Sequence, residues 1–152
     1  MTPTPVELPP DHPYYGRKLF TVEEANATLP LVRAIAKDLA ELSRDVIERR
    51  QRVAALLEAR PAKDHELYRE ELEQIQQELQ QDVQKLQEYI EELRQLGVEP
   101  KNGPEGLVDF PSWMDGRVVY LCWKLDEPEI LYWHELDAGF AGRQPLPAAT
   151  SS

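Results

Sequence analysis

The sequence predicts a mainly α-helical (α+β) fold, in which a long antiparallel, coiled-coil-like helical hairpin is capped by a small antiparallel β-hairpin or three-stranded sheet. The first observation is that apolar residues recur at steps of three and four over residues 32–60 and again over 68–96, which is the pattern of a coiled-coil seam. The second is that seven of the twelve aromatic residues, including all three tryptophans, lie within residues 110–140. A sheet this small is not stable alone, so we expect it to pack on the open end of the hairpin.

The first helix has a clear beginning. Thr21 and Glu24 have the spacing of a capping box, in which each side chain accepts a hydrogen bond from the other residue's amide. Pro30 lies inside the helical pattern, and proline disrupts helix interiors. We therefore expect a short opening turn from Val22, a kink near Asn26 to Thr28 and the long helix from about Leu29, ending before Pro61. The seam residues of this helix are Val32, Ile35, Leu39, Leu42, Val46, Val53 and Leu56.

The second helix is predicted to start after a short turn at residues 61–64, with Asp64 as its N-cap. Gly97 is expected to end it, because glycine adopts the left-handed conformation of a helix C-terminus. A strict heptad register places Asp82 in the seam of the second helix, at the height where Arg49 interrupts the apolar seam of the first helix. We hypothesise that Arg49 and Asp82 pair and set the register; the alternative is that both point to solvent. The seam residues here are Leu72, Ile75, Leu79, Val83, Leu86, Ile90 and Leu93.

Beyond Gly97 the sequence predicts a loop over residues 98–106, a short strand over 107–110 and a turn at Asp115-Gly116. A β-hairpin is predicted from strands 117–125 and 130–136. Pairing Leu125 with Ile130 places His134 opposite Leu121, on the more apolar face that should meet the helices. Cys122 then points to the other face, so we expect no metal or thiol–imidazole site shared by Cys122 and His134.

The expected organisation is a proline-rich N-terminal arm (1–18), a single domain (19–147) and a frayed tail (148–152). The domain consists of the helical hairpin, about residues 22–96, and the aromatic cap, about 107–144. Residues 1–18 hold five of the thirteen prolines, so we expect this N-terminal segment to be non-helical. A disordered leader up to Pro13 is an equally good interpretation of its first part.

The net charge of −11 is concentrated in the second helix, since residues 64–99 hold eleven acidic and three basic residues. Such a surface repels nucleic acid and anionic lipid, so we expect neither as a partner. The single cysteine, Cys122, excludes an internal disulfide and favours a reducing cytoplasm. No run of apolar residues is long enough for a signal peptide or a membrane span.

The densest polar cluster is His134, Glu135 and Asp137, followed by Arg143 among glycines. One interpretation is a small binding site, with His134 as base or ligand and Arg143 holding an anion. The other is structural: His134 is buried and bonded to a backbone carbonyl, and Arg143 forms a salt bridge. No zinc spacing, phosphate loop or nucleophile elbow is present. The sequence therefore predicts no metal and no cofactor, and it favours a protein that is not an enzyme.

Several motifs resemble a bacterial family catalogued as domain of unknown function 2203, over about residues 18–147. They are Phe20 to Asn26 with Leu29-Pro30, Gly106 to Pro111, Leu121 to Trp123, Glu127 to Ile130, and Trp133 to Pro145. The resemblance implies one domain of bacterial, cytoplasmic type and assigns no chemistry.

Taken together, these features favour an interaction or structural module that self-associates, most simply as a homodimer. A four-helix bundle would cover apolar residues beside the seam, namely Leu31, Ala36, Ala40, Ala54, Leu57, Val83 and Ile90. The alternatives are a small-molecule or metal-binding protein built on His134, Glu135, Asp137 and Arg143, and a module that binds a basic protein partner through its acidic second helix.

Overall fold

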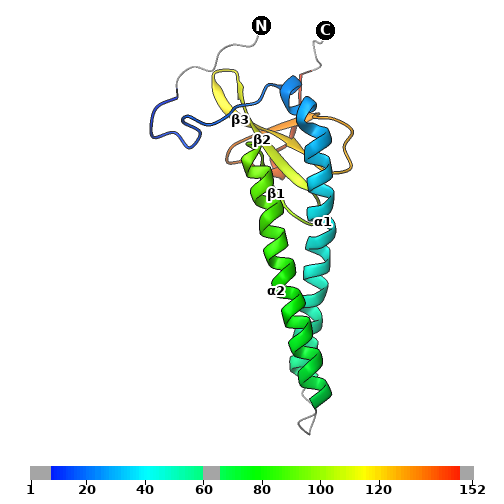
Figure 1. The fold of residues 1–152 in the computed structure, drawn as a ribbon. Helices are drawn as coiled ribbons and strands as arrows, with labels where there is room; N and C mark the ends of the chain where they lie inside the picture. The colour runs from blue at the N-terminus through cyan, green and yellow to red at the C-terminus, as the bar shows by residue number, and fades with distance from the viewer. Residues whose placement is uncertain (1–7, 60–65, 148–152) are drawn as a thin grey trace.

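A computed structural model describes residues 8–59 and 66–147. Two long helices, α1 (Val22–Ala59) and α2 (Glu66–Gln95), pack together as a hairpin, and a five-stranded antiparallel sheet follows them. Figure 1 shows the sheet at one end of the hairpin, beside the start of α1 and the end of α2. The predicted fold class is therefore confirmed. Among the described helices, none has a stretch long and apolar enough to cross a membrane.

Helix α1 begins where the capping box predicts. The Glu24 amide donates to Thr21 Oγ1 at 3.0 Å, and the Thr21 amide donates to Glu24 Oε1 at 2.9 Å. The prediction of a separate opening turn before Leu29 is wrong, because the helix continues through Pro30. Ala25 and Leu29 on one side of the proline are buried with Val32 on the other, and this shared core keeps both parts in one helix.

Helix α2 ends at Gly97, whose φ is 88°. The Val98 amide bonds to the Leu93 carbonyl at 3.0 Å and the Gly97 amide to the Arg94 carbonyl at 2.9 Å, which is a Schellman motif. The expected turn at 61–64, the N-cap Asp64 and the tail 148–152 lie outside the described residues.

Halfway along the hairpin, Arg49 of α1 forms an ion pair with Asp82 of α2. The Arg49 side chain is 36% exposed and the Asp82 side chain 23%, so the pair lies at the edge of the seam. Its proposed role in setting the register stays a prediction.

The sheet has the simple order β1-β2-β3-β4-β5. Its strands are β1 (Glu99–Asn102), β2 (Leu107–Met114), β3 (Arg117–Trp123), β4 (Tyr132–Glu135) and β5 (Gln144–Pro145). The predicted loop over 98–106 thus contains a strand, β1, whose Pro100 is tolerated because β1 lies at the sheet edge. The turn at Asp115-Gly116 is present, and both residues have positive φ (51° and 81°), as a two-residue β-hairpin turn requires.

The predicted register between β3 and β4 is wrong by one residue. Tyr120 pairs with His134, and Cys122 pairs with Tyr132. The chain does not form a ladder up to Leu125 and Ile130; instead, the Ile130 amide donates to Asn26 Oδ1 of α1 at 2.8 Å, and Ile130 is buried. This shift moves His134 to the opposite face of the sheet from the one predicted, since a one-residue slip inverts the facing of a strand.

Each face of the sheet is covered by a different part of the chain. On one face, Phe110, Leu121 and Trp123 pack with residues of α1 and with Leu93 of α2 in the main core. On the other face, a second cluster contains Tyr14, Val118 and Tyr120, with Leu8, Leu19, Trp113 and Leu136 packed against it. We call residues 8–20, which supply Tyr14, Leu8 and Leu19, the N-terminal strap. We call the sheet with its covering segments the head.

The half of the hairpin farthest from the sheet has a different character. No residue of 47–59 or 66–85 is buried, and we call these two segments the arm. By contrast, Ala36 and Ala40 of α1 are buried in the head, so they do not need a second molecule to cover them. Leu57 and Leu67 of the arm are 45% and 79% exposed. The core of this protein therefore lies in the head.

Candidate metal centre

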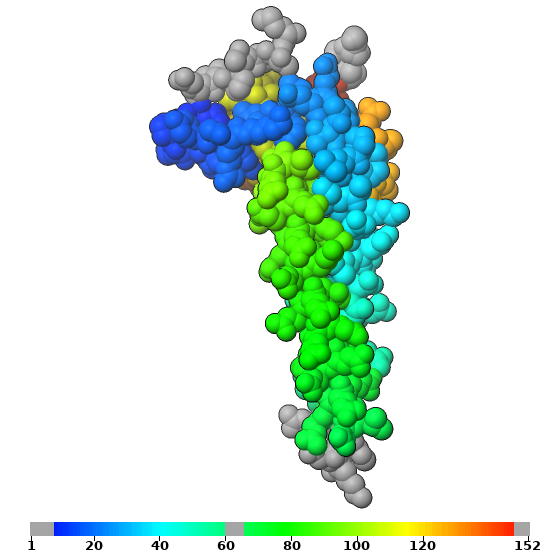
Figure 2. Space-filling view, in the orientation of Figure 1, coloured from blue at the N-terminus to red at the C-terminus, as the bar shows by residue number. Residues whose placement is uncertain are grey.

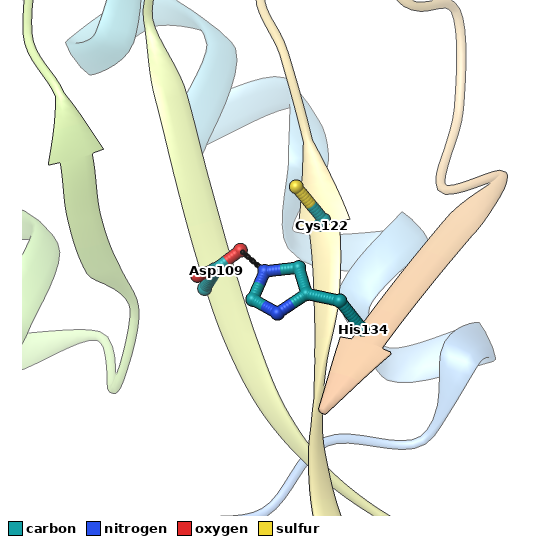
Figure 3. Close-up of side chains that lie close together, drawn as sticks. All are labelled: Asp109, Cys122 and His134. Atoms are coloured by element: carbon teal, nitrogen blue, oxygen red, sulfur yellow. Dashed lines mark hydrogen bonds and ion pairs between the residues drawn. The ribbon is translucent and has the colours of Figure 1, made fainter. Parts of the chain in front are cut away.

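Three metal-ligating side chains converge on the face of the sheet opposite the helices. Asp109 of β2, Cys122 of β3 and His134 of β4 each offer a donor atom, and these atoms all lie within 4.8 Å of one another. Figure 3 shows the three side chains reaching across adjacent strands toward one point. Their exposed fractions are 1%, 0% and 2%, so the cluster is fully buried.

The strand register explains this convergence. Asp109 and Cys122 are a cross-strand pair, and paired residues place their side chains on the same face. His134 pairs with Tyr120, which shares a face with Cys122 because residues two apart in a strand point to the same side. The prediction that Cys122 and His134 point to opposite faces is therefore wrong.

The hydrogen bonds of His134 determine which nitrogen is available. Nδ1 lies 2.7 Å from the Glu135 carbonyl oxygen, which can only accept, so Nδ1 carries a hydrogen. Nε2 faces Asp109 Oδ1 at 3.1 Å. A carboxylate and an unprotonated nitrogen would repel each other at this distance, so the two groups share a proton when no metal replaces it.

Burial controls the acid–base properties of the other two groups. Loss of solvent raises the pKa of the Asp109 carboxyl, and the neighbouring His134 opposes this rise. Burial, together with the Asp109 charge, also raises the pKa of the Cys122 thiol to about 12. In the metal-free protein Cys122 is therefore a protonated, buried thiol, and such a thiol is a poor nucleophile.

The structure separates most of the four site residues predicted from sequence, although Arg143 contacts Cys122, which lies in the cluster with His134. Only His134 belongs to the buried cluster. Glu135 lies on the other face of β4 and forms an ion pair with Arg117, whose Nε donates to Oε1 at 2.9 Å. Asp137 is exposed in the segment that follows β4.

Arg143 has a structural position. Its Nη2 donates to Glu127 Oε1 at 2.6 Å and to the Cys122 carbonyl at 3.2 Å. Its guanidinium carbon lies 4.1 Å from the centre of the Tyr132 ring and 4.7 Å from that of Phe140. Arg143 thus ties the segment containing the short 3-10 helix (Phe140–Gly142) to the β3–β4 loop, and its side chain is not directed at an external anion.

A layer of tyrosines covers the cluster. The Tyr120 ring contacts the His134 ring edge-on, with centroids 5.5 Å apart. The Tyr120 and Tyr14 hydroxyls hydrogen-bond at 2.6 Å, and Tyr14, from the strap, is itself buried. The strap therefore separates the cluster from solvent on this side.

Asp109 was missed in the sequence interpretation, although it gives a signal. It is the one charged residue in the predicted strand Leu107–Phe110, and a carboxylate in a buried strand needs a partner. Pairing it with Cys122 follows from the hairpin turn at Asp115-Gly116. Adding His134 requires the correct β3–β4 register.

A family model described as an uncharacterized conserved protein, DUF2203, matches residues 18–146. The comparison with curated proteins gives no match, and neither does the comparison with solved structures.

Proposed function

The chain belongs to the uncharacterized family DUF2203, and on that premise we propose that it binds a transition-metal ion of the zinc class through Asp109, Cys122 and His134. The observation that carries the proposal is the convergence of a carboxylate, a thiol and an imidazole within 4.8 Å in a fully buried position. All three residues lie within the matched segment.

The donor set suits zinc. Thiolate sulfur, imidazole nitrogen and carboxylate oxygen are its usual protein ligands. A thiolate and a carboxylate together carry two negative charges, so a divalent ion would give a neutral centre. Neutrality matters because an uncompensated charge at this depth is costly.

His134 is already oriented as a ligand. A metal-bound histidine commonly donates its second ring N–H to a backbone carbonyl or a carboxylate. The Nδ1–H of His134 makes such a bond to the Glu135 carbonyl, which leaves the Nε2 lone pair directed at Asp109 and the metal position. The metal would replace the proton that His134 and Asp109 share.

Three protein ligands leave one position of a tetrahedral zinc ion for water or another small ligand, which is the arrangement of catalytic rather than structural zinc sites. The chain supplies the three ligands and excludes bulk water.

The test is metal uptake by the purified protein. Elemental analysis after dialysis against zinc should give one bound ion per chain, and cobalt substitution should give the thiolate-to-metal charge-transfer band that reports Cys122. Free zinc at about 100 times its dissociation constant should stabilise the protein by about 2.7 kcal/mol, a rise of about 5–10 °C in Tm for a chain of this size.

The matched control compares two acidic residues. Asp109→Asn should abolish zinc uptake and the Tm rise. Asp137→Asn, at the exposed acid that the sequence had favoured, should leave both unchanged. Equal zinc uptake by wild type and Asp109→Asn would exclude this centre.

A second candidate function is self-association through the arm, with a second copy of the chain as the partner. The specific observation is that Leu57 and Leu67 of the arm are exposed although the arm contains no buried core. The arm segment of α1 has net charge +1 (three basic, two acidic), and that of α2 has −4 (six acidic, two basic). Charge complementarity supports an antiparallel arrangement in which α1 of one copy lies against α2 of the other.

Sedimentation or light scattering at increasing protein concentration tests this arrangement. The double variant Leu57→Ser with Leu67→Ser should shift the wild-type dimer to monomer. Leu31→Ser, at an exposed leucine near the head (52%), should leave the dimer unchanged. A wild-type protein that stays monomeric at about 100 μM, where even weak specific dimers form, would refute self-association.

A further inference from the structure

A pocket of about 680 Å³ lies between the strap and the end of α2. Its lining includes Tyr14, Arg17 and Lys18 of the strap and Arg94 at the end of α2. Figure 2 shows the strap, in dark blue, lying across the head beside the light-green end of α2. The volume is within the range of pockets that hold small molecules.

Three residues of the pocket lining connect the pocket to the buried cluster through strand pairing or contact, namely Tyr14, Glu99 and Pro111. Glu99 of β1 is the cross-strand partner of Asp109. Pro111 is the cross-strand partner of Tyr120, whose ring contacts His134. Tyr14 lies between the pocket and Tyr120, because it lines the pocket and its hydroxyl is bonded to that of Tyr120.

The electrostatic character of the pocket differs from that of the whole molecule. Its lining has three cations, Arg17, Lys18 and Arg94, against two carboxylates, Glu91 and Glu99. One of those carboxylates, Glu99, is already paired with Arg94 at 3.2 Å. The pocket therefore has net charge +1 in a protein with net charge −11, and it favours small anions over cations.

We propose that this pocket is the entrance to the Asp109–Cys122–His134 cluster, that Tyr14 is its gate, and that it admits small carboxylate-type anions to the open position of the bound metal. Only the last step rests on the proposed metal binding. Entrance and gate are properties of the metal-free protein as well.

Tyr14 is suited to this role because it contacts the sheet through its side chain, by the hydroxyl bond to Tyr120 and by packing in one cluster with Val118. It lies in a non-helical segment, and its hydroxyl bond to Tyr120 joins residues 106 positions apart. Nearby, the strap is held by the bond from the Phe20 amide to the Pro111 carbonyl at 2.7 Å. Lifting the strap between these points uncovers Tyr120, without breaking any ladder hydrogen bond of the sheet.

The test uses Cys122 as a reporter, because it is the only cysteine in the chain and lies in the cluster. In the metal-free protein its alkylation is followed by mass spectrometry with two reagents of similar size, the anion iodoacetate and neutral iodoacetamide. When the strap opens and closes faster than the reagent reacts with the open form, the alkylation rate measures the population of the open state.

Three variants test the gate. Tyr14→Phe removes one buried hydrogen bond and should speed alkylation by both reagents about fivefold. Tyr14→Ala also removes the ring and should speed it about 100-fold. Tyr15→Ala, at the exposed neighbouring tyrosine (53%), should label at the wild-type rate. Tyr14 variants that label no faster than Tyr15→Ala would overturn the gate.

The double variant Arg17→Gln with Lys18→Gln tests the entrance. At low salt it should lower the ratio of iodoacetate to iodoacetamide rates about threefold or more, because charged entrances enrich ions of the opposite sign. An unchanged ratio would overturn the assignment of this pocket as the route. Both measurements are made without metal, so the gate and the entrance can be demonstrated even if the protein takes up no zinc. Failure of the entrance proposal is therefore distinguishable from failure of the proposed metal binding. In the zinc-loaded protein, alkylation by both reagents should be suppressed.

Discussion

Removing either member of the buried Asp109–His134 pair should destabilise the metal-free protein far more than the paired contact itself is worth. The two groups are 1% and 2% exposed and 3.1 Å apart. When one is removed, the other keeps its burial and loses its partner, which costs about 3–5 kcal/mol for a buried charged pair. We take the lower end, about 3 kcal/mol, for Asp109→Asn and His134→Gln, because both replacements keep a hydrogen-bonding group.

The double variant is the decisive measurement. If the two residues act as a unit, it should lose little more than either single variant, which gives a coupling of about 2–3 kcal/mol. The assay is urea unfolding at neutral pH with a chelator present, followed by tryptophan fluorescence. A domain with about 5–15 kcal/mol of stability tolerates each single loss.

Arg117 and Glu135 supply the control pair. They join the same two strands, β3 and β4, from the opposite face of the sheet, and their side chains are 42% and 39% accessible. Solvent screens an exposed pair, so its coupling should be far weaker than that of the buried pair. Additive losses at Asp109 and His134, or single losses below about 1 kcal/mol, would refute the view that the cluster is a coupled buried unit.

The remaining predictions concern pH, capping, register and core. Burial raises the pKa of the Asp109 carboxyl above its ordinary 3.8. The contribution of Asp109 to folding stability is therefore fully present below pH 3.8 and is lost as pH rises through its folded-state pKa. In urea unfolding across pH, the stability of wild type relative to Asp109→Asn should fall as pH rises. Thr21→Ala should cost about 1 kcal/mol in thermal unfolding through loss of the N-cap, and an unchanged Tm would contradict the capping role. A double-mutant cycle at Arg49 and Asp82 should show a coupling of about 0.5 kcal/mol in chemical unfolding, and zero coupling would remove their role in register. Leu93→Ala should cost about 2–5 kcal/mol because Leu93 is fully buried, and a loss under about 1 kcal/mol would place it outside the core.

The helices were predictable because their signals are local. The Thr21–Glu24 pair and the Gly97 terminus involve residues three to five positions apart, and the seam repeats within each helix. The Asp115-Gly116 turn is equally local. The separate opening turn expected before Leu29 is absent because tertiary burial on both sides of Pro30 outweighs a local preference, which sequence pattern alone does not measure.

The candidate site was not predictable because it depends on the pairing register of β3 with β4. That register depends on contacts that the connection between the two strands makes within itself, with Arg143 and with α1. Glu127 Oε1 accepts from the Lys124 amide at 2.9 Å and from Arg143, and the Glu127 carbonyl accepts from the Trp123 indole. With Ile130 bonded to α1, these contacts leave an odd number of residues between the paired residues Cys122 and Tyr132. A simple hairpin suggested an even number. The parity of that count decides the face of His134, and with it the existence of the cluster.

The uneven distribution of the core between head and arm has a consequence for how unfolding is observed. All three tryptophans lie in the strands of the head, while the arm holds much of the helix and no buried residue. Backbone amides of the arm should exchange with deuterium through local opening, and those around Leu39 and Leu93 only through global opening. Tryptophan fluorescence and far-UV circular dichroism will then give different midpoints for the same sample. Such a difference would come from the shape of one continuous chain, with no second domain required.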